Sequence, residues 1–199
     1  KPRGVPKAGW CVNEKTAYEA ALGASMAGRR VLVSMKHVGL NVAADPFVNS
    51  AIVHMNGGLV LAVADDPGMH SSQNEQDSRI FGDFAQIPIF EPSNQQEAYD
   101  MTREAFELSE RLRLPVMVRL VTRLAHSRAQ VQTSAPSEPK EVDCSEDWCV
   151  WTLLPVNARK RFRRLLDLQP RLREYSEQSA FNSLALSGPQ GIIVSGIAY

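Results

Sequence analysis

An uninterrupted apolar run, residues 59–63 (Leu-Val-Leu-Ala-Val), constrains the fold of this chain more than any other feature. It lacks the alternation of polar and apolar residues that a half-exposed strand shows. Strands of this kind are buried on both faces, as in a parallel sheet with helices on either side. Gly57 and Gly58 precede the run and a long polar loop follows it, so we expect a strand bounded by turns.

Strand and helix patterns alternate along the neighbouring sequence. Such alternation implies right-handed crossovers and a mainly parallel sheet with helices on both faces. We therefore predict an α/β fold, a three-layer αβα domain, followed by a linker and a C-terminal helix. Ser93 and Gln96 are placed to form a capping box for one of the helices. The expected strands are residues 31–33, 59–63, 87–90 and 115–120, and the expected helices are 14–27, 46–55 and 94–113.

Composition excludes several classes of protein. Lys plus Arg and Asp plus Glu are each 22, so no net charge indicates binding to nucleic acid or to an anionic membrane. No apolar run approaches the roughly 18 residues of a membrane-spanning helix, and the N-terminus lacks the apolar core of a signal peptide. The three cysteines are odd in number, which argues against a disulfide framework. We expect a cytoplasmic protein.

The last third of the sequence differs from the rest. Residues 130–156 are predicted to form a surface linker because they begin with a stretch rich in Ser, Pro and Glu. Residues 157–190 are predicted to be a connecting helical segment, interrupted by Pro170. Residues 191–197 are typical of a buried strand followed by a glycine turn. Since the sequence also lacks a first methionine, we expect a fragment, with a truncated α/β domain starting at 191–199.

The connecting segment is strongly basic, with five Lys or Arg residues within positions 159–164. Such a cluster is compatible with RNA or DNA binding. Leucines on the same stretch and the absence of a flanking aromatic platform favour a solvated or partner-facing helix instead.

Glu14 is a lone carboxylate at the start of a helix built from small residues. Asn13 is placed to cap this helix, and the positive end of the helix dipole favours an acid in the first turn. Glu14 is therefore either a companion of the cap or a functional carboxylate. The small residues recur at spacings of three and four and predict a close-packing face: Ala17, Ala20, Ala21, Ala24 and Ala27.

Polar residues follow two of the predicted strands, at 35–41 and 64–79. In parallel α/β sheets, ligands bind at the carboxyl ends of strands. His37 and His70 lie in these segments, where a histidine can transfer protons or contact substrate. Asp65 and Asp66 are candidate magnesium ligands, but adjacent acids at a strand end are more often turn and cap residues. We therefore predict no metal ligand in this chain, and no nucleotide-binding motif is present.

Taken together, residues 12–46 and 57–92 resemble the alpha subunits of indolepyruvate ferredoxin oxidoreductase, a family of thiamine diphosphate-dependent 2-oxoacid oxidoreductases. The likeness covers most of the chain and is weakest in the linker. It rests on long phrases, which are far more specific than three-residue motifs: Asn-Glu-Lys at 13–15, Met-Lys-His-Val-Gly-Leu-Asn-Val-Ala-Ala-Asp at 35–45, and Ala-Asp-Asp-Pro-Gly-Met-His-Ser-Ser-Gln-Asn-Glu-Gln-Asp at 64–77.

The resemblance implies a pyrimidine-binding domain in residues 1–129, without its N-terminal part. Glu14 would be the catalytic acid, hydrogen-bonded to ring nitrogen N1′ of the cofactor's aminopyrimidine and promoting loss of the proton from C2. The other candidate cofactor contacts are Lys36, His37 and Gly39. His70 and Arg79 are the candidate substrate contacts, with Arg79 pairing the substrate carboxylate in a two-pronged contact.

The resemblance also implies a reaction and partners. An aryl pyruvate such as indolepyruvate would be decarboxylated oxidatively, with the acyl group passing to coenzyme A and electrons passing through iron-sulfur clusters to ferredoxin. The sequence has no Gly-Asp-Gly motif followed by a spaced Asn and no cysteine cluster. A diphosphate-binding domain or subunit must therefore hold the diphosphate and Mg²⁺, and the iron-sulfur clusters must lie on missing sequence or on another subunit.

We accordingly expect an oligomer in which this chain supplies half of the cofactor site and is inactive alone, with no nucleic-acid or membrane partner. Two alternatives remain open. One is a 2-oxoacid ferredoxin oxidoreductase of other substrate range, and the other is an assembly domain that no longer binds cofactor.

Overall fold

The computed structural model describes residues 6–136, 147–186 and 188–199. Its centre is a four-stranded, entirely parallel sheet in the order β1-β2-β4-β3. This confirms the predicted α/β fold with a parallel sheet. The strands are β1 (Val31–Lys36), β2 (Leu59–Asp65), β3 (Ile89–Phe90) and β4 (Val116–Val121).

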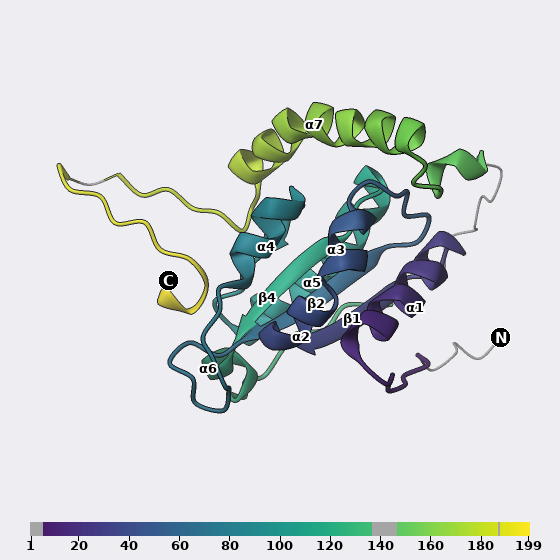
Figure 1. Ribbon diagram of the computed structural model, residues 1–199. Helices are drawn as coiled ribbons and strands as arrows, with labels where there is room; N and C mark the ends of the chain where they lie inside the picture. Colours follow the sequence, from purple (N-terminus) through teal and green to yellow (C-terminus); the bar gives the residue numbers. More distant parts are fainter. Residues whose placement is uncertain (1–5, 137–146, 187) are drawn as a thin grey trace.

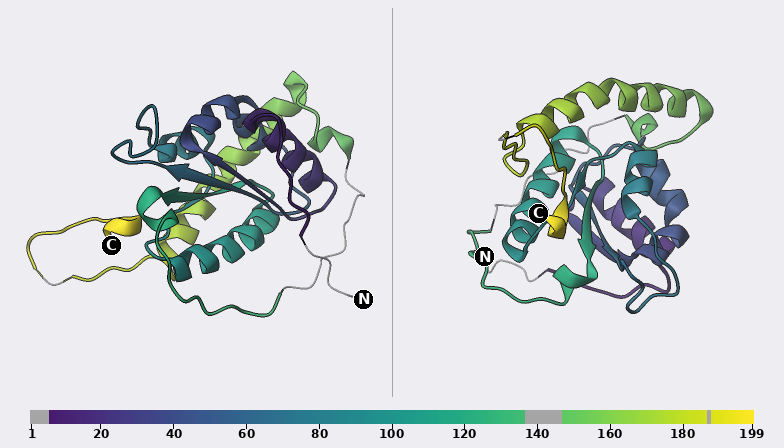
Figure 2. Two further views of the ribbon diagram at one scale, coloured as in Figure 1. Left: turned by 90° about the horizontal axis from the view of Figure 1, so that it is seen from below. Right: turned by 90° about the vertical axis from the view of Figure 1, so that its left-hand side faces the viewer.

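Helices cover both faces of the sheet (Figures 1 and 2). One face is covered by α1, α2, α3 and α4, and the other by α5, which packs on β2 and β4. In the described part of the chain, none of the helices combines the length and apolar character needed to cross a bilayer. The helices are α1 (Glu14–Met26), α2 (His37–Val42), α3 (Ala44–Ser50), α4 (Ser78–Ala85), α5 (Gln95–Leu112), α6 (Thr122–Ala125) and α7 (Pro155–Gln178), with short 3-10 turns at Trp148–Val150 and Gly196–Ala198.

The apolar run predicted to be a doubly covered strand is β2. Leu59, Val60, Leu61 and Val63 have no exposed surface, because β2 lies between β1 and β4 with helices on both of its faces. Burying one such aliphatic side chain contributes about 1.5–3 kcal/mol. The run therefore anchors the core and places its polar end, beginning at Asp65, at the carboxyl edge of the sheet.

The helix expected at 46–55 is wrong in its bounds, because α3 begins two residues earlier, at Ala44, and ends at Ser50. Pro46 lies in the first turn of α3, a position where the missing N–H of proline is tolerated, so the helix begins before it. Ser50 closes the helix: its hydroxyl donates to the carbonyl of Phe47 (2.6 Å) and accepts from the hydroxyl of Tyr18 (2.8 Å).

Two further local predictions need correction. The N-cap of α5 is Asn94, whose side chain accepts from the N–H of Glu97 (2.9 Å), and Glu97 in turn accepts from the N–H of Ser93 (2.7 Å). The reciprocal acid is therefore Glu97, and Gln96 plays no part in the cap. The strand expected at 87–90 is also shorter, because β3 contains only Ile89 and Phe90.

Part of the predicted linker is docked on the domain. Gln132 forms backbone hydrogen bonds with the side chain of Gln96 in α5 (2.8 and 3.2 Å), and the N–H of Ser134 donates to the hydroxyl of Tyr99 (2.9 Å). Residues 137–146, which include Cys144, lie outside the described residues. Residues 132–134 are thus held along α5. Farther along the predicted linker, the carbonyl of Val150 accepts from the N–H of His54 (3.4 Å), and α7 already begins at Pro155.

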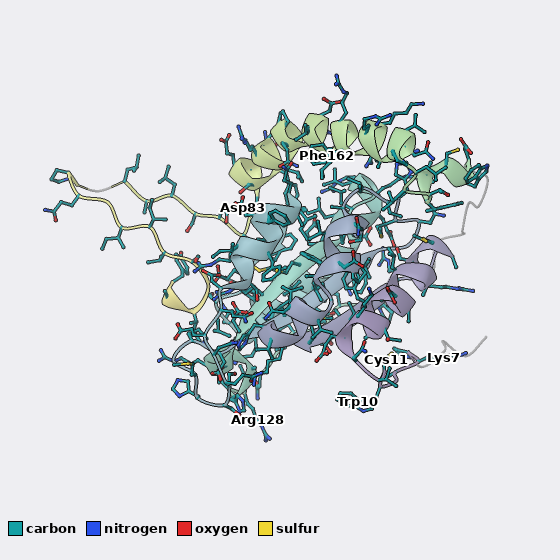
Figure 3. All side chains as sticks on the ribbon, in the orientation of Figure 1. Lys7, Trp10, Cys11, Asp83, Arg128 and Phe162 are labelled. Carbon is teal, nitrogen blue, oxygen red and sulfur yellow. The ribbon has the colours of Figure 1, made fainter. Side chains whose placement is uncertain are left out.

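The basic helix α7 packs on the domain with one face. Leu165 and Leu168 are buried in the core, and α7 continues through Pro170, so the predicted interruption is wrong. Arg164 donates to the carbonyl of Leu112 and Gln169 to that of Gln86, residues that shortly precede β4 and β3. The helix therefore crosses the amino ends of the strands (Figure 1). Phe162 of this helix is about half exposed (Figure 3).

The buried strand predicted at 191–197 is wrong. Ile192 is 89% exposed and Ile193 is 100% exposed, and no strand is assigned there. A strand needs a neighbour to form hydrogen bonds with, and none pairs with this segment in the described residues. Only Gly196 is buried, where it packs against Glu91. The start of a following domain at 191–199 stays a prediction.

His54 makes the stability of the fold dependent on pH. It lies beside α7, where its Nε2 is 2.9 Å from a guanidinium nitrogen of Arg161. Burial lowers the pKa of His54 from 6.5 to about 4, and the positive charges of nearby arginines, Arg164 foremost, add to the effect. The unfolded chain therefore takes up a proton at higher pH than the folded chain. We expect the free energy of unfolding to decrease as the pH falls from 6.5 to about 4.

Urea unfolding measured across this pH range tests the expectation. His54→Gln should flatten this part of the stability curve, whereas the change His126→Gln, at an exposed histidine, should leave the slope intact. An unchanged slope in His54→Gln would show that another group is responsible.

Candidate functional site

Glu14 lies where α1 meets the carboxyl edge of the sheet. The side chain of Asn13 accepts from the N–H of Thr16 (2.9 Å), which caps α1 and places Glu14 in its first turn. Since α1 leads into β1 by a short turn and packs against it, the start of α1 lies at the carboxyl end of β1. This is where α2 begins (Figure 1).

The carboxyl group of Glu14 rests on Gly39 of α2. A Cβ atom at Gly39 would lie 2.5 Å from Cγ, 2.8 Å from Oε1 and 2.9 Å from Cδ of Glu14. Only glycine therefore leaves space for this side chain. Glu14 is half-buried, and within the described residues its carboxylate takes part in no hydrogen bond or ion pair. The arrangement presents a carboxylate with open lone pairs at the edge where ligands bind in such sheets.

We expect Gly39→Ala to displace the Glu14 side chain, because the flexible carboxyl group moves more readily than the backbone. If Glu14 acts on a bound cofactor, proton exchange at cofactor C2 should slow by roughly tenfold, since small misplacements at a reacting centre are costly. NMR of quenched samples of the assembled enzyme measures this rate.

Gly23→Ala is the matched control for that substitution. Gly23 lies in the interior of α1 with no heavy atom within 4 Å of a Cβ. This change should leave the exchange rate unaltered and stabilise the protein by roughly 0.5–1 kcal/mol, through the better helix propensity of alanine. Equal exchange rates in both variants would contradict the importance of the Glu14–Gly39 contact.

The loop between β2 and α4 is ordered by its own carboxylates. Asp66 accepts from the N–H of Ser71 (2.7 Å), the hydroxyl of Ser72 (2.7 Å) and the hydroxyl of Thr122 (2.6 Å). These donors, Thr122 first, hold the pKa of Asp66 well below its usual range. Asp66 therefore serves as a turn and cap residue in this structure. Within the described residues, no group of three or more His, Cys, Asp or Glu side chains is placed to hold a metal ion.

Lys36 and His37 contact this same loop. Lys36 Nζ donates to the carbonyl of Ser71 (2.5 Å). The ring of His37 is completely buried, with Nδ1 3.3 Å from the carbonyl oxygen of Ala64 and Nε2 3.1 Å from that of Asn74. Both ring nitrogens are therefore already engaged, and in this conformation neither is open to a cofactor. Gly39, by contrast, lies directly against the Glu14 side chain.

Arg79 is paired within the protein. Its Nε and one terminal nitrogen donate to Asp77 (2.8 and 2.7 Å), and the other terminal nitrogen reaches Ser195 (3.2 Å) and Glu91 (3.6 Å). The guanidinium lowers the pKa of Asp77. A substrate carboxylate would have to displace Asp77 to form a two-pronged contact. His70, by contrast, is exposed, with its ring over Gly68.

A buried ion network lies behind Arg79. Arg119 of β4 is 6% exposed and pairs through Nε with Asp65 (2.6 Å) and through a terminal nitrogen with Glu91. Asp65 also accepts from the N–H of Ser78 (3.0 Å) and from its hydroxyl. Arg119 was not among the candidate residues predicted from the sequence, although a charged residue inside the apolar pattern of β4 is a signal of a buried pair.

At the carboxyl edge of the sheet lies the half-buried carboxylate of Glu14, which no donor among the described residues engages. It stands beside a loop ordered by hydrogen bonds to Asp66. Residues 10–146 match the family described as pyruvate flavodoxin/ferredoxin oxidoreductase, thiamine diphosphate-binding. The chain belongs to this family, which confirms the resemblance in the sequence.

Named relatives give the same assignment. The chain is 43% identical over 193 residues to indolepyruvate oxidoreductase subunit IorA of Archaeoglobus fulgidus, covering 96% of this chain and 31% of that protein. It is 44% identical over 200 residues to IorA of Pyrococcus abyssi, with the same coverage. The chain therefore spans about a third of the length of these relatives. A transketolase variant from Pichia stipitis aligns at TM-score 0.39 and 13% identity, over 83% of this chain and 28% of that one, which is too low to support a conclusion.

Proposed function

We propose that this chain supplies the carboxylate that activates the aminopyrimidine of thiamine diphosphate in an oxidoreductase acting on aryl pyruvates, indolepyruvate first among them. The observation that carries the proposal is the Glu14 carboxyl group, half-buried against Gly39 with its oxygens unengaged in the described residues. Asp65, Asp66 and Asp77 lie at the same edge, but each is occupied by protein donors.

The residues present fit one half of the cofactor. A free carboxyl group can hydrogen-bond a ring nitrogen, and the glycine beneath it leaves room for the Glu14 side chain that carries this group. We propose that another domain or subunit holds the diphosphate and Mg²⁺. When bound, thiamine diphosphate supplies the carbon nucleophile and the electron sink for decarboxylation.

The role of Glu14 is to hold a proton at its carboxyl oxygen and share it with the ring nitrogen N1′. The contact with Gly39 fixes the position of that oxygen, and Asn13 fixes the start of the helix that carries it. His70, exposed on the neighbouring loop, is a candidate contact for the oxoacid. Arg79 is a candidate contact for the substrate carboxylate, which it could bind once its ion pair with Asp77 is broken.

The relatives' printed names support an oxidoreductase of indolepyruvate, and the rest of the reaction is our proposal. Indolepyruvate oxidoreductase subunits cover almost the whole of this chain at about 40% identity or more. We infer an oligomeric cytoplasmic enzyme in which ferredoxin accepts the electrons, coenzyme A takes the acyl group, and iron-sulfur clusters lie on sequence outside this chain.

Calorimetric titration tests the half-site. Thiamine diphosphate with Mg²⁺ is expected to bind the full-length protein assembled with its partner subunit, and to bind the 199-residue chain weakly or not at all. Tight stoichiometric binding by this chain alone would overturn the proposed division of the site.

Steady-state rates with indolepyruvate, pyruvate and a branched-chain oxoacid test which substrate the enzyme prefers. The largest kcat/KM is expected for indolepyruvate.

A second candidate function is oxidation of branched-chain oxoacids. The chain is 29% identical over 117 residues to ketoisovalerate oxidoreductase subunit VorB of Methanothermobacter thermautotrophicus, covering 53% of this chain and 32% of that protein. A kcat/KM that is highest for the branched-chain oxoacid would favour this alternative.

A further inference from the structure

His37 lies where three elements meet. It is the first residue of α2 and directly follows β1. Its buried ring contacts the carbonyl oxygen of Ala64, in β2, and that of Asn74, in the loop between β2 and α4. The ring therefore joins the end of one strand, the start of a helix and the middle of a loop.

Both partners of the ring are carbonyl oxygens, which only accept hydrogen bonds. A neutral imidazole donates to one of them and an imidazolium donates to both. A neutral ring can therefore bond only one of the two, and loss of the ring would leave at least one part-buried carbonyl oxygen without this donor, which is costly. His37 thus fastens residues 66–77 to α2.

The contacts continue from His37 to Glu14. Gly39 lies two residues after His37 in the same turn of α2, a helix of only six residues. A shift of the first turn of α2 therefore moves Gly39, and the Glu14 side chain rests on Gly39. A continuous path of contacts connects the loop, His37, Gly39 and the open carboxylate.

We propose that His37 is a positioning residue that couples the 66–77 loop to the Glu14 carboxyl group. The loop and the acid come from elements far apart in the sequence, and His37 fixes their positions relative to each other. The part of this inference that concerns the cofactor rests on the proposed function, whereas the ordering of the loop does not. Lys36 makes a separate and partly exposed contact with the loop, through Ser71.

Hydrogen exchange of the full-length protein without cofactor tests the ordering of the loop. His37→Ala is expected to raise amide exchange in residues 66–77 by roughly tenfold, the effect of losing a buried hydrogen-bonding group. His37→Gln, which can donate to one carbonyl, should give a smaller increase and serves if the alanine variant does not fold. Lys36→Met, as the matched control, should change exchange by less than about threefold. Unchanged loop exchange in the His37 variants would overturn the proposal.

Proton exchange at cofactor C2 tests the coupling to Glu14 in the assembled, loaded protein. His37→Gln is expected to slow this exchange by roughly three- to tenfold, because displaced reacting groups lose rate. A loosened loop with a normal C2 rate would overturn the coupling. If the C2 rate also proves insensitive to Glu14→Gln, the proposed function fails, while the measured loop exchange still decides whether His37 orders the loop.

Discussion

Glu14→Gln is expected to slow exchange of the thiamine diphosphate C2 proton by roughly 10²–10³-fold in the assembled enzyme, the range of effects for a positioned acid or base. Glutamine keeps the size of the side chain and its contact with Gly39, but its amide cannot lose or share a carboxyl proton. The loss should therefore appear in the rate of exchange and in kcat, with little change in the affinity for the cofactor. Quenched-flow NMR of C2 deuteration measures the rate directly.

Glu19→Gln provides the control for this prediction. Glu19 lies on the same helix but is exposed, with its Oε1 3.9 Å from Nζ of Lys15. Its substitution is expected to leave C2 exchange unchanged. Glu14→Asp, which shortens the side chain and withdraws the carboxyl group, should give an intermediate rate. Full C2 exchange in Glu14→Gln would show that the acid acting on the pyrimidine lies elsewhere.

Arg119→Met is expected to destabilise the protein by about 3–5 kcal/mol, the cost of removing one partner from a buried ion pair. Arg119 is 6% exposed and Asp65 is 1% exposed, so the substitution leaves Asp65 without its cation and Glu91 with Arg79 alone. The lost free energy should appear as a lower midpoint in urea unfolding followed by circular dichroism.

Arg79→Met is the matched comparison, since Arg79 belongs to the same network but its side chain is 47% exposed. Exposed ion pairs contribute about 0–1 kcal/mol, so this variant should be nearly as stable as the parent. The same variant tests whether Arg79 contacts the substrate. A raised KM for the oxoacid with unchanged stability supports that role, and an unchanged KM contradicts it. Equal destabilisation by both variants would contradict the difference in burial.

Most of the fold was predictable because its elements differ sharply in local pattern. The run at 59–63 is apolar at every position, and a strand covered on both faces buries four of these five residues. Long phrases around Glu14 and in residues 64–77 were specific enough to indicate the family, which the match over residues 10–146 confirms. The ends of the elements were less predictable. Pro46 lies in the first turn of α3 and Glu97 takes part in the cap of α5, and the residue at which a helix starts leaves no periodic signal in the sequence.

The candidate site was predictable only in part. His37 was selected because it follows a strand, but its position along the chain does not show that both ring nitrogens meet backbone carbonyls. Arg79 was selected for its guanidinium, and its pairing with Asp77 is a matter of side-chain geometry. The segment at 191–197 has a strand-like pattern, yet a pattern cannot supply the neighbouring strand that it needs.

The sequence alone determined the class of fold, the family, and Glu14 as the acid to examine. These depend on residue type and spacing, which the chain carries locally. The tertiary structure decided which acids are open, because Asp65, Asp66 and Asp77 are occupied by donors from elsewhere in the chain while Glu14 rests on Gly39. Whether a carboxylate is paired depends on contacts between distant segments, and packing alone determines those contacts.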